Sequence, residues 1–333
     1  MVYDVAAIGE LLIDFTSSGD SERGNPEFEA NPGGAPGNVL AMLAKLGHKT
    51  AFIGKVGNDM FGEMLTDGLR RLGIETSGII KTFEAGTTLA FIRNSDDGER
   101  EFSFYRNPGA DTMLREDEVS AEIIGNCKVF HFGSLSLTDE PSRSATRRAV
   151  AAAGENGALI SFDPNLRPLL WGDLEEARRQ IAWGCSVCDV LKVSDDELEF
   201  IVGGGGVDGS GGGDGGSECS DGIIALRERF PGIKVIFLTK GALGAEGYWG
   251  EYSAAKPAFT GINVIDTTGA GDAFFGCCLS HLLRCNINTP NQEALENMII
   301  CANAAAAIVT TRKGALLSMP NEDEILRLLA KAY

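Results

Sequence analysis

The sequence predicts an α/β protein whose main sheet is largely parallel and carries helices on both faces. Short β-rich runs alternate with helical segments along most of the 333 residues, as such a sheet requires. The β-rich runs are almost continuously apolar, which is typical of strands buried on both faces. At roughly 150 residues per domain, this length allows two domains or one large unit. No repeat of about 20 to 50 residues is visible, which favours one globular unit.

Six segments have the composition of strands in this main sheet. They are Val2–Ile8, Thr50–Val56, Val129–Phe132, Leu159–Asp163, Val190–Val193 and Val235–Thr239. Helices are expected in the intervals, and apolar periodicity is clear from Val39 to Leu46 and from Ala273 to Leu283.

Two segments depart from the alternation. Thr87–Arg93 and Arg100–Arg106 flank a turn at Asn94–Gly98, which predicts a β-hairpin that projects from the sheet as a lid. Gly203–Gly216 holds ten glycines in fourteen residues and is expected to be a flexible, linker-like insertion. Its two aspartates argue against a phosphate-binding role.

Composition excludes several classes of function. Lys and Arg total 29 against 47 Asp and Glu, and a net charge of −18 repels nucleic acids and anionic membranes. No apolar stretch reaches the ~18 residues that a membrane span needs. The acidic N-terminus lacks the basic region of a secretion signal, so a cytoplasmic location is expected. Three histidines, none in H-E-x-x-H spacing, exclude a zinc protease of that type.

The sharpest chemical signal is the segment Asp266–Asp272, in which a glycine turn leads into a helix. The backbone amides of Gly269, Ala270 and Gly271 can point at an anion there, and the helix dipole adds to their field. Asp272 in the first turn is either a capping residue or a general base. A carboxylate beside a bound anion is repelled by it, so the proton-accepting role explains the pairing better.

Three further segments place polar groups near strand or helix ends. Asp14 follows the first strand, Asn31–Asn38 is a glycine-rich loop before a helix, and Asp163–Arg167 follows a central strand. Ligands of α/β sheets bind at the carboxyl ends of strands, although each segment alone could be an ordinary surface feature. A Walker A motif is absent, because Gly54-Lys55 and Lys240-Gly241 lack its spacing.

Taken together and in this order, these motifs and Thr239–Gly244 resemble those of the ribokinase-like (PfkB) carbohydrate kinases over nearly the whole chain. The segments Gly9–Phe15, Phe104–Asp111, Phe132–Leu137 and Asp163–Pro168 are most similar to bacterial-type fructokinases. The resemblance implies a three-layer αβα sandwich with a mostly parallel central sheet and a small β-sheet lid. It implies one kinase domain over residues 1–333, with lid segments around 11–32 and 84–107, and the glycine-rich insertion at 203–217 departs from the family.

The resemblance also implies the site. Asp272 would be the catalytic base, and Gly269, Ala270 and Gly271 would form the anion hole. Substrate-binding residues would be Asp14, Gly33, Gly34, Asn38, Phe104, Arg106, Asn165 and Arg167. Nucleotide-binding residues would be Lys192, Ser194, Thr239, Lys240, Gly241, Gly244 and Asn303.

Metal sites follow from the same resemblance. The family's N-x-x-E motif occurs as Ser194–Glu197, with Ser in place of Asn, and Glu197 would bind Mg²⁺ through water. A monovalent cation, expected to be K⁺, would lie near Asp266, Thr268, Val309, Arg312, Gly314 and Ser318.

The leading hypothesis is a cytoplasmic kinase that transfers the γ-phosphoryl group of ATP to D-fructose, giving fructose 6-phosphate. A 2-keto-3-deoxygluconate kinase is the alternative, because Arg106 and Arg167 could hold the carboxylate of that substrate. A non-catalytic sugar or nucleotide sensor is a further alternative, although the base and glycines are retained. Homodimerisation through the lid is expected to cover its exposed edge.

Overall fold

A large nine-stranded sheet forms the centre of the molecule in the computed structural model, which describes residues 2–94, 100–203 and 217–332. The strand order is β13-β12-β11-β10-β9-β8-β1-β4-β5, and only β12 runs antiparallel to its neighbours. The strands are β1 (Tyr3–Ile8), β4 (Thr50–Gly57), β5 (Glu75–Thr82), β8 (Cys127–Gly133), β9 (Leu159–Asp163), β10 (Val190–Ser194), β11 (Val235–Thr239), β12 (Ala245–Trp249) and β13 (Tyr252–Lys256). The α/β class is confirmed.

The six predicted central strands all occur, each within two residues of its predicted ends. Strands β5, β12 and β13, which lie at the two sides of the sheet, were not predicted. Side strands are covered incompletely, so they mix polar and small residues with apolar ones, and β13 (YSAAK) has no fully buried position. The predicted turn at 94–98 and the insertion at 203–217 lie almost entirely outside the described residues.

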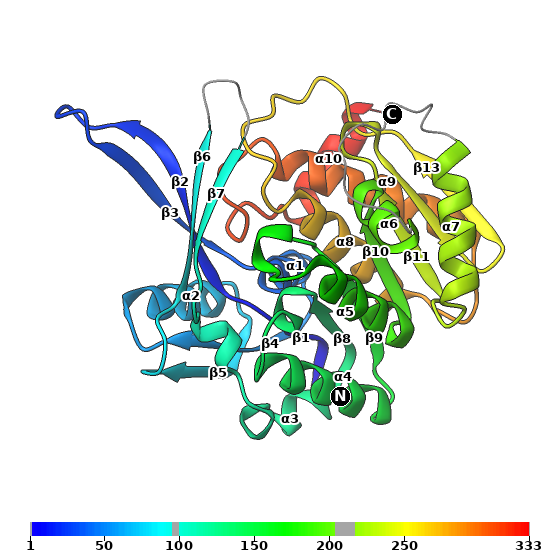
Figure 1. Cartoon of the computed structure of the whole chain (residues 1–333). Coiled ribbons are helices and arrows are strands. Elements are labelled where there is room, and N and C mark those ends of the chain that lie inside the picture. The colour runs from blue at the N-terminus through cyan, green and yellow to red at the C-terminus, as the bar shows by residue number, and fades with distance from the viewer. Residues whose placement is uncertain (1, 95–99, 204–216, 333) are drawn as a thin grey trace.

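Helices cover both faces of the large sheet (Figure 1). One layer contains α1 (Ala35–Lys45), α2 (Met60–Arg71), α8 (Ala270–Arg284), α9 (Gln292–Val309) and α10 (Glu322–Ala332). The other contains α3 (Ala121–Ile124), α4 (Ser142–Glu155), α5 (Leu174–Val187), α6 (Asp195–Val202) and α7 (Ser217–Arg229). Short 3₁₀ turns cover Ala110–Met113, Glu116–Glu118, Leu135–Leu137, Pro168–Leu170 and Gly241–Leu243.

Strand β1 shows how the two cores form. Its side chains alternate, so Val5 and Ala7 join the first core while Ala6 and Ile8 join the second. All four side chains are fully buried. Because side chains on both faces are buried, Val5–Ile8 are all apolar, and the strand lies inside the sheet between β8 and β4.

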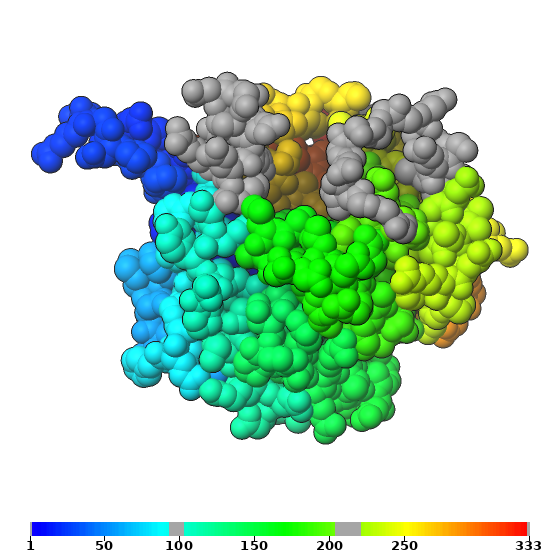
Figure 2. Space-filling model, viewed as in Figure 1, coloured from blue at the N-terminus to red at the C-terminus, as the bar shows by residue number. Residues whose placement is uncertain are grey.

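A second, small sheet stands beside the carboxyl ends of the central strands. Its order is β3-β2-β6-β7, formed by β2 (Leu12–Asp20), β3 (Pro26–Gly33), β6 (Thr88–Asn94) and β7 (Arg100–Tyr105). The predicted hairpin of β6 and β7 belongs to it, and the far end of the β2–β3 hairpin extends away from the body (Figure 2). Among the described residues, no helix is long and apolar enough to cross a membrane.

Candidate active site

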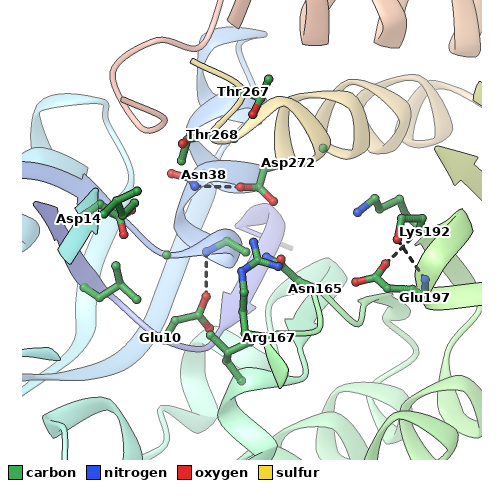
Figure 3. Close-up of a pocket in the computed structure, with 18 of the residues that line it drawn as sticks. Glu10, Asp14, Asn38, Asn165, Arg167, Lys192, Glu197, Thr267, Thr268 and Asp272 are labelled. Atoms are coloured by element: carbon green, nitrogen blue, oxygen red, sulfur yellow. Dashed lines mark hydrogen bonds between the residues drawn. The ribbon is translucent and has the colours of Figure 1, made fainter. Parts of the chain in front are cut away.

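A pocket of about 500 Å³ opens between the large sheet and the small sheet. Its walls come from the loop after β1, the ends of β9 and β10, and the first turns of α1 and α8, with β2, β6 and β7 on the other side. Figure 3 shows polar side chains from these separate segments directed into the same space. The topology therefore gathers several of the predicted site residues at one edge of the large sheet.

The predicted base lies where α8 begins. Asp272 is 8% exposed, and its Oδ2 accepts a 2.8 Å hydrogen bond from Nδ2 of Asn38 on α1. Burial raises the pKa of Asp272, which the Asn38 hydrogen bond partly opposes. Gly269 precedes the helix with φ 80°, and a Cβ there would lie 2.6 Å from Cβ of Ala315, so this position requires glycine.

The start of α1 is fixed by a residue that sequence analysis did not predict. Glu10 follows β1, is 2% exposed, and accepts a 2.8 Å hydrogen bond from the backbone N–H of Ala35. Gly34 has φ 122°, and a Cβ there would lie 2.3 Å from the Glu10 carbonyl oxygen. Together they fix the helix start one turn before Asn38. A carboxylate directly after the first strand was the available signal.

Glu10 has one carboxyl oxygen, Oε2, that is buried without a hydrogen bond in the described structure. Burial raises the pKa of this side chain to about 7. The cause is the loss of hydration of the ionised form, which hydrogen bonds from the backbone do not replace.

The small sheet contributes Asp14 and an apolar wall. Oδ2 of Asp14 lies 2.4 Å from where a Cβ on Gly33 would be, so glycine at position 33 leaves room for this carboxylate. Burial raises the pKa of Asp14 to about 7, although the positive charge of Arg167 acts against the rise. Leu12, Ile92 and Phe104 line the same side of the pocket.

The segment after β9 turns sharply into the pocket. Asn165 has φ 43°, and its backbone N–H donates a 3.1 Å hydrogen bond to Oδ1 of Asp163, which is 1% exposed. This turn places Asn165 and Arg167 in the pocket wall (Figure 3). Arg167 donates to the carbonyl of Leu166 and has no carboxylate partner in the part of the chain that the structure describes.

The end of β10 carries the altered magnesium motif. Ser194 caps α6, because its hydroxyl accepts from the N–H of Glu197 at 3.2 Å while Oε2 of Glu197 accepts from the N–H of Ser194 at 2.9 Å. Oε1 of Glu197 accepts from the N–H of Leu166 at 2.8 Å. Ser thus performs the helix-capping task that Asn performs equally well. Lys192, two residues earlier, also lines the pocket.

Most residues predicted to contact the nucleotide do not line this pocket. Thr239 lies on β11 beside Ser194, and Nζ of Lys240 lies 2.5 Å from Glu246. Asn303 donates to the carbonyls of Lys256 and Pro257, both at 3.1 Å. Gly241 and Gly244 belong to the turn between β11 and β12, and both have positive φ. They form a separate group next to the edge of the pocket where β10 ends.

The residues predicted to bind a monovalent cation do converge. Asp266 accepts from the N–H and hydroxyl of Thr268 at 2.9 and 2.7 Å, and from the N–H of Gly314 at 3.2 Å. Arg312 donates to the carbonyl of Ser318 at 3.1 Å and pairs with Glu324, and Val309 ends α9 just before this loop. The loop therefore packs directly behind the turn at Gly269, which lies against Ala315, and the oxygen atoms present suit a hard cation.

Arg106 is placed differently from its predicted role. It is absent from the pocket lining, and its side chain is 4% exposed. Its Nε and Nη2 bond Oδ2 of Asp111 at 2.8 and 2.6 Å, Nη1 donates to Thr138, and Nη2 also donates to the Leu135 carbonyl. Each guanidinium nitrogen is thus used inside the protein, below the end of β7, rather than facing the sugar side of the pocket. Sequence spacing could not distinguish an inward from a pocket-facing arginine.

Several lining residues carry no signal in the sequence by themselves. They are Leu12, Ala35, Ile92, Leu135 and Thr267. Most are apolar and lie on elements where apolar residues serve packing equally well. Thr267 lies inside the glycine-turn motif, so its neighbours Asp266 and Gly269 were the signal that could have found it.

Comparisons with known proteins agree with this geometry. The chain is 43% identical to fructokinase-1 of Zea mays over 330 residues, covering 98% of each chain. The fold matches a fructokinase with bound ATP from Xylella fastidiosa with a TM-score of 0.86 at 30% identity, over 100% of this chain and 99% of that one. It matches a double mutant of fructokinase from Vibrio cholerae O395, in fructose, ADP and potassium ion bound form, with a TM-score of 0.83 at 29% identity, over 98% of each chain.

The family is shown by a match along almost the whole sequence. The model of the pfkB family of carbohydrate kinases matches residues 3–322, which include both sheets and every side chain described above in the pocket. The fold is accordingly ribokinase-like, with its large, mostly parallel sheet and its separate small sheet. With this match, the pocket at the sheet edge and the buried Asp272 at the start of α8 have one common explanation: the chain belongs to the pfkB family of carbohydrate kinases.

Proposed function

We propose that this protein is an ATP-dependent fructokinase that converts D-fructose and ATP into fructose 6-phosphate and ADP. The observation that carries the proposal is the buried Asp272, held by Asn38 beside the amides that begin α8. A base next to an anion-binding turn is what phosphoryl transfer to a hydroxyl requires. The fructokinases of Zea mays and Xylella fastidiosa support fructose as the acceptor.

The chemical step can be assigned to residues of this chain. Asp272 accepts the proton of the attacking sugar hydroxyl, whose oxygen bonds to the γ-phosphorus as the bond from phosphorus to the β-phosphate oxygen breaks. The amides of Gly269, Ala270 and Gly271 stabilise the charge on the transferred group. The raised pKa of Asp272 makes it a stronger base than an exposed aspartate while leaving it able to ionise.

Magnesium fits the donor set of the site. The pocket offers hard oxygen ligands, and Mg²⁺ in kinases is held mainly by phosphates and water with one or two carboxylates. Glu197 would orient such water, with its two oxygens already positioned by Ser194 and Leu166. When bound, the metal would supply positive charge that neutralises the phosphates.

The loop behind the anion hole supports activation by K⁺. Asp266, Thr268 and Gly314 are joined by hydrogen bonds there, so a cation that orders them also orders Gly269. Turnover in KCl should exceed turnover in NaCl at equal ionic strength. Equal rates in both salts contradict this part of the proposal.

A carboxylate substrate is less well supported. The guanidinium of Arg106 is bonded to Asp111, Thr138 and Leu135, so of these two arginines Arg167 remains to bind a sugar acid. Asp14, Asp272 and Glu10 in the same pocket favour the hydroxyls of a neutral sugar.

The decisive assay is ADP release with ATP, Mg²⁺ and K⁺ against fructose, ribose, 2-keto-3-deoxygluconate and no sugar. Strong turnover with fructose and a low rate without sugar are expected, because the small sheet would shield ATP from water only with sugar bound. Preference for the keto acid would assign Arg167 to its carboxylate. No turnover with any of the sugars would favour a sensor.

We also propose that the small sheet joins two copies of this chain. Its aromatic face contains Phe15 stacked on Phe91, with ring centroids 4.8 Å apart, and the more exposed Phe28 and Tyr105. Tyr105 is 66% exposed, which is costly for a large aromatic surface in a lone chain. Sedimentation equilibrium should give a dimer that Phe28→Ser with Tyr105→Ser dissociates, and a monomeric parent protein rules the interface out.

A cytoplasmic location belongs to the same proposal. Cys127, Cys185, Cys188, Cys277, Cys278, Cys285 and Cys301 are all free thiols, which suits a reducing compartment where ATP is available. Fractionation of cells of the source organism should recover the protein with cytosolic markers.

A further inference from the structure

A buried carboxylate caps α1 from another part of the chain. Gly34, the residue before α1, has no side chain that could cap the helix, and Pro36 has no N–H. The backbone N–H of Ala35 instead donates to Oε1 of Glu10 in a buried 2.8 Å hydrogen bond. Glu10, which follows β1, therefore performs the task of a helix cap although it lies 25 residues before Ala35 in the sequence.

Close backbone contacts surround the same hydrogen bond. A Cβ on Gly9 would lie 2.6 Å from Cγ of Pro36, and a Cβ on Gly34 would meet the carbonyl oxygen of Glu10. The segment after β1 and the first turn of α1 therefore lie in direct contact. Because a hydrogen bond depends on angle as well as on distance, the bond to Glu10 also limits rotation of α1 about its axis.

Helix α1 connects this placement to Asp272. Asn38, in the first turn of α1, is 4% exposed and donates from Nδ2 to Oδ2 of Asp272, while its Oδ1 is buried without a hydrogen-bond partner in the described part of the chain. Figure 3 shows this bond and the bond that Glu10 accepts as dashed lines. Helix α1 also packs closely on α8, where a Cβ on Gly276 would lie 2.7 Å from Cβ of Met42. A shift of α1 would therefore move Asn38 relative to Asp272.

We propose that Glu10 is a positioning residue for the base: its hydrogen bond to Ala35 sets the place of α1, and α1 in turn holds Asn38 against Asp272. This inference rests on the proposed kinase function. The Asn38 bond lowers the pKa of Asp272, because it favours the ionised form that accepts the sugar hydroxyl proton. Glu10 needs only an acceptor oxygen for its task, and a carboxylate, a neutral acid and an amide all provide one. Its length therefore matters more than its charge.

Two substitutions separate the length of Glu10 from its charge. Glu10→Gln keeps the length and an acceptor oxygen, whereas Glu10→Asp keeps the charge but is one methylene shorter and so loses the bond to Ala35. Glu10→Asp should lower kcat by about 10- to 10²-fold, and Glu10→Gln should lower it much less. The reverse order would overturn the proposal, because it would assign the effect of Glu10 to its charge.

A double-mutant cycle with Glu10→Asp and Asn38→Ala tests whether the effect passes through Asn38. Each single change should lower kcat, and the double variant should be no slower than Asn38→Ala, since the second change removes what the first one positions. Losses that multiply in the double variant would show that Glu10 acts independently of Asn38. That result would overturn the proposal.

The protonation of Asp272 gives a readout that needs no turnover. NMR titration of its carboxyl carbon, assigned with Asp272→Asn, follows its pKa in the protein without substrate. Asn38→Ala and Glu10→Asp should both raise this pKa, since both weaken the bond that favours the ionised form. Other charged groups that act on Asp272 are common to all variants: Lys192, Arg167, Glu197 and Asp14. An unchanged pKa in Glu10→Asp would overturn the proposal even if kcat falls.

A helix cap in the opposite layer provides the control. Asp173 accepts from the N–H of Glu175 at 3.0 Å where α5 begins, and α5 contributes none of the described residues that line the pocket. Asp173→Ala should lower Tm slightly and leave kcat and the pKa of Asp272 unchanged. A loss of kcat equal to that of Glu10→Asp would overturn the specific role of Glu10. An inactive parent protein would reject the fructokinase proposal, while the NMR titration would still decide the role of Glu10.

Discussion

The large sheet and the small sheet border the same pocket but hold their residues in different ways. On the large-sheet side, Asp272 is bonded by Asn38, and Glu197 by Ser194 and Leu166, all at the ends of buried strands or the starts of helices. On the small-sheet side, Leu12, Ile92 and Phe104 present mainly apolar surface. The predicted base and the predicted magnesium-binding carboxylate thus lie on the large-sheet side, whereas the small sheet adds an apolar wall and Asp14.

That anchor is the buried pair of Arg106 and Asp111. Asp111 also accepts a 2.5 Å hydrogen bond from the hydroxyl of Thr88, where β6 begins, while Arg106 follows the end of β7. Strands β6 and β7 are therefore joined through Arg106 and Asp111 to Leu135 and Thr138 of the main body. We therefore expect substitutions of pocket residues on the large-sheet side to reduce kcat. Substitutions of Arg106 or Asp111 should instead reduce the free energy of unfolding.

The largest effect is expected for Asp272→Asn. Loss of the base should reduce kcat by ~10²–10⁴ while Tm and ATP affinity remain nearly unchanged. Steady-state kinetics and calorimetry measure both, with the exposed Asp67→Asn as control. A kcat near that of the parent protein would refute the assignment and remove the main contrast between the two sides.

Arg106→Leu tests the anchor. Removing one partner of a buried pair leaves the Asp111 charge uncompensated and should cost about 3–5 kcal/mol of unfolding free energy. Denaturant titration measures the loss, and Arg106→Leu with Asp111→Leu should recover part of it. If stability is unchanged while the KM for the sugar rises strongly, Arg106 contacts the substrate and the structural role is wrong.

Arg167→Leu tests an arginine on the large-sheet side, for comparison with the buried Arg106. Its guanidinium has no carboxylate partner among the described residues, so its loss should leave Tm unchanged and lower kcat/KM by roughly 10²-fold. The exposed Arg70→Leu, in an i,i+3 surface pair, is the control. A fall in Tm comparable to that of Arg106→Leu would show that Arg167 is structural as well.

The smallest effect concerns the pH dependence of stability at Glu10. Its pKa rises from 4.5 to about 7 on folding, so the folded state binds this proton more tightly than the unfolded state. The resulting stability is present below about pH 4.5 and is lost as the pH rises through about 7. Relative to Glu10→Gln, the parent protein should lose about 1–3 kcal/mol between those limits.

Thermal unfolding from about pH 5 to about pH 8 checks this difference. Titration of Asp14 is common to both proteins and cancels in the comparison. The exposed Glu22→Gln should follow the parent at every pH. A constant gap between the parent protein and Glu10→Gln would show that Glu10 does not change its protonation on folding.

The central strands could be predicted because burial on both faces leaves mostly apolar residues along them. The edge strands β5 and β13 could not, since partial exposure removes that signal. Asp272, Asn38 and the Asp163–Arg167 turn, which the structure brings to one pocket, could be singled out because glycine turns and polar groups at strand ends have a local cause. Glu10 was missed because its one signal, a carboxylate directly after the first strand, does not show that the side chain is buried against the start of a helix.

The sequence by itself determined the α/β class, the order of the motifs and the glycine turn that begins α8, because propensity, periodicity and backbone freedom are local properties. Only the tertiary structure decided that Arg106 turns inward to Asp111 and that Lys192 stands beneath Gly271. Lys192 and Gly271 come from segments far apart in the chain. For Arg106, the side chain could point either inward or into the pocket. Both depend on how layers pack, which spacing along a chain does not record.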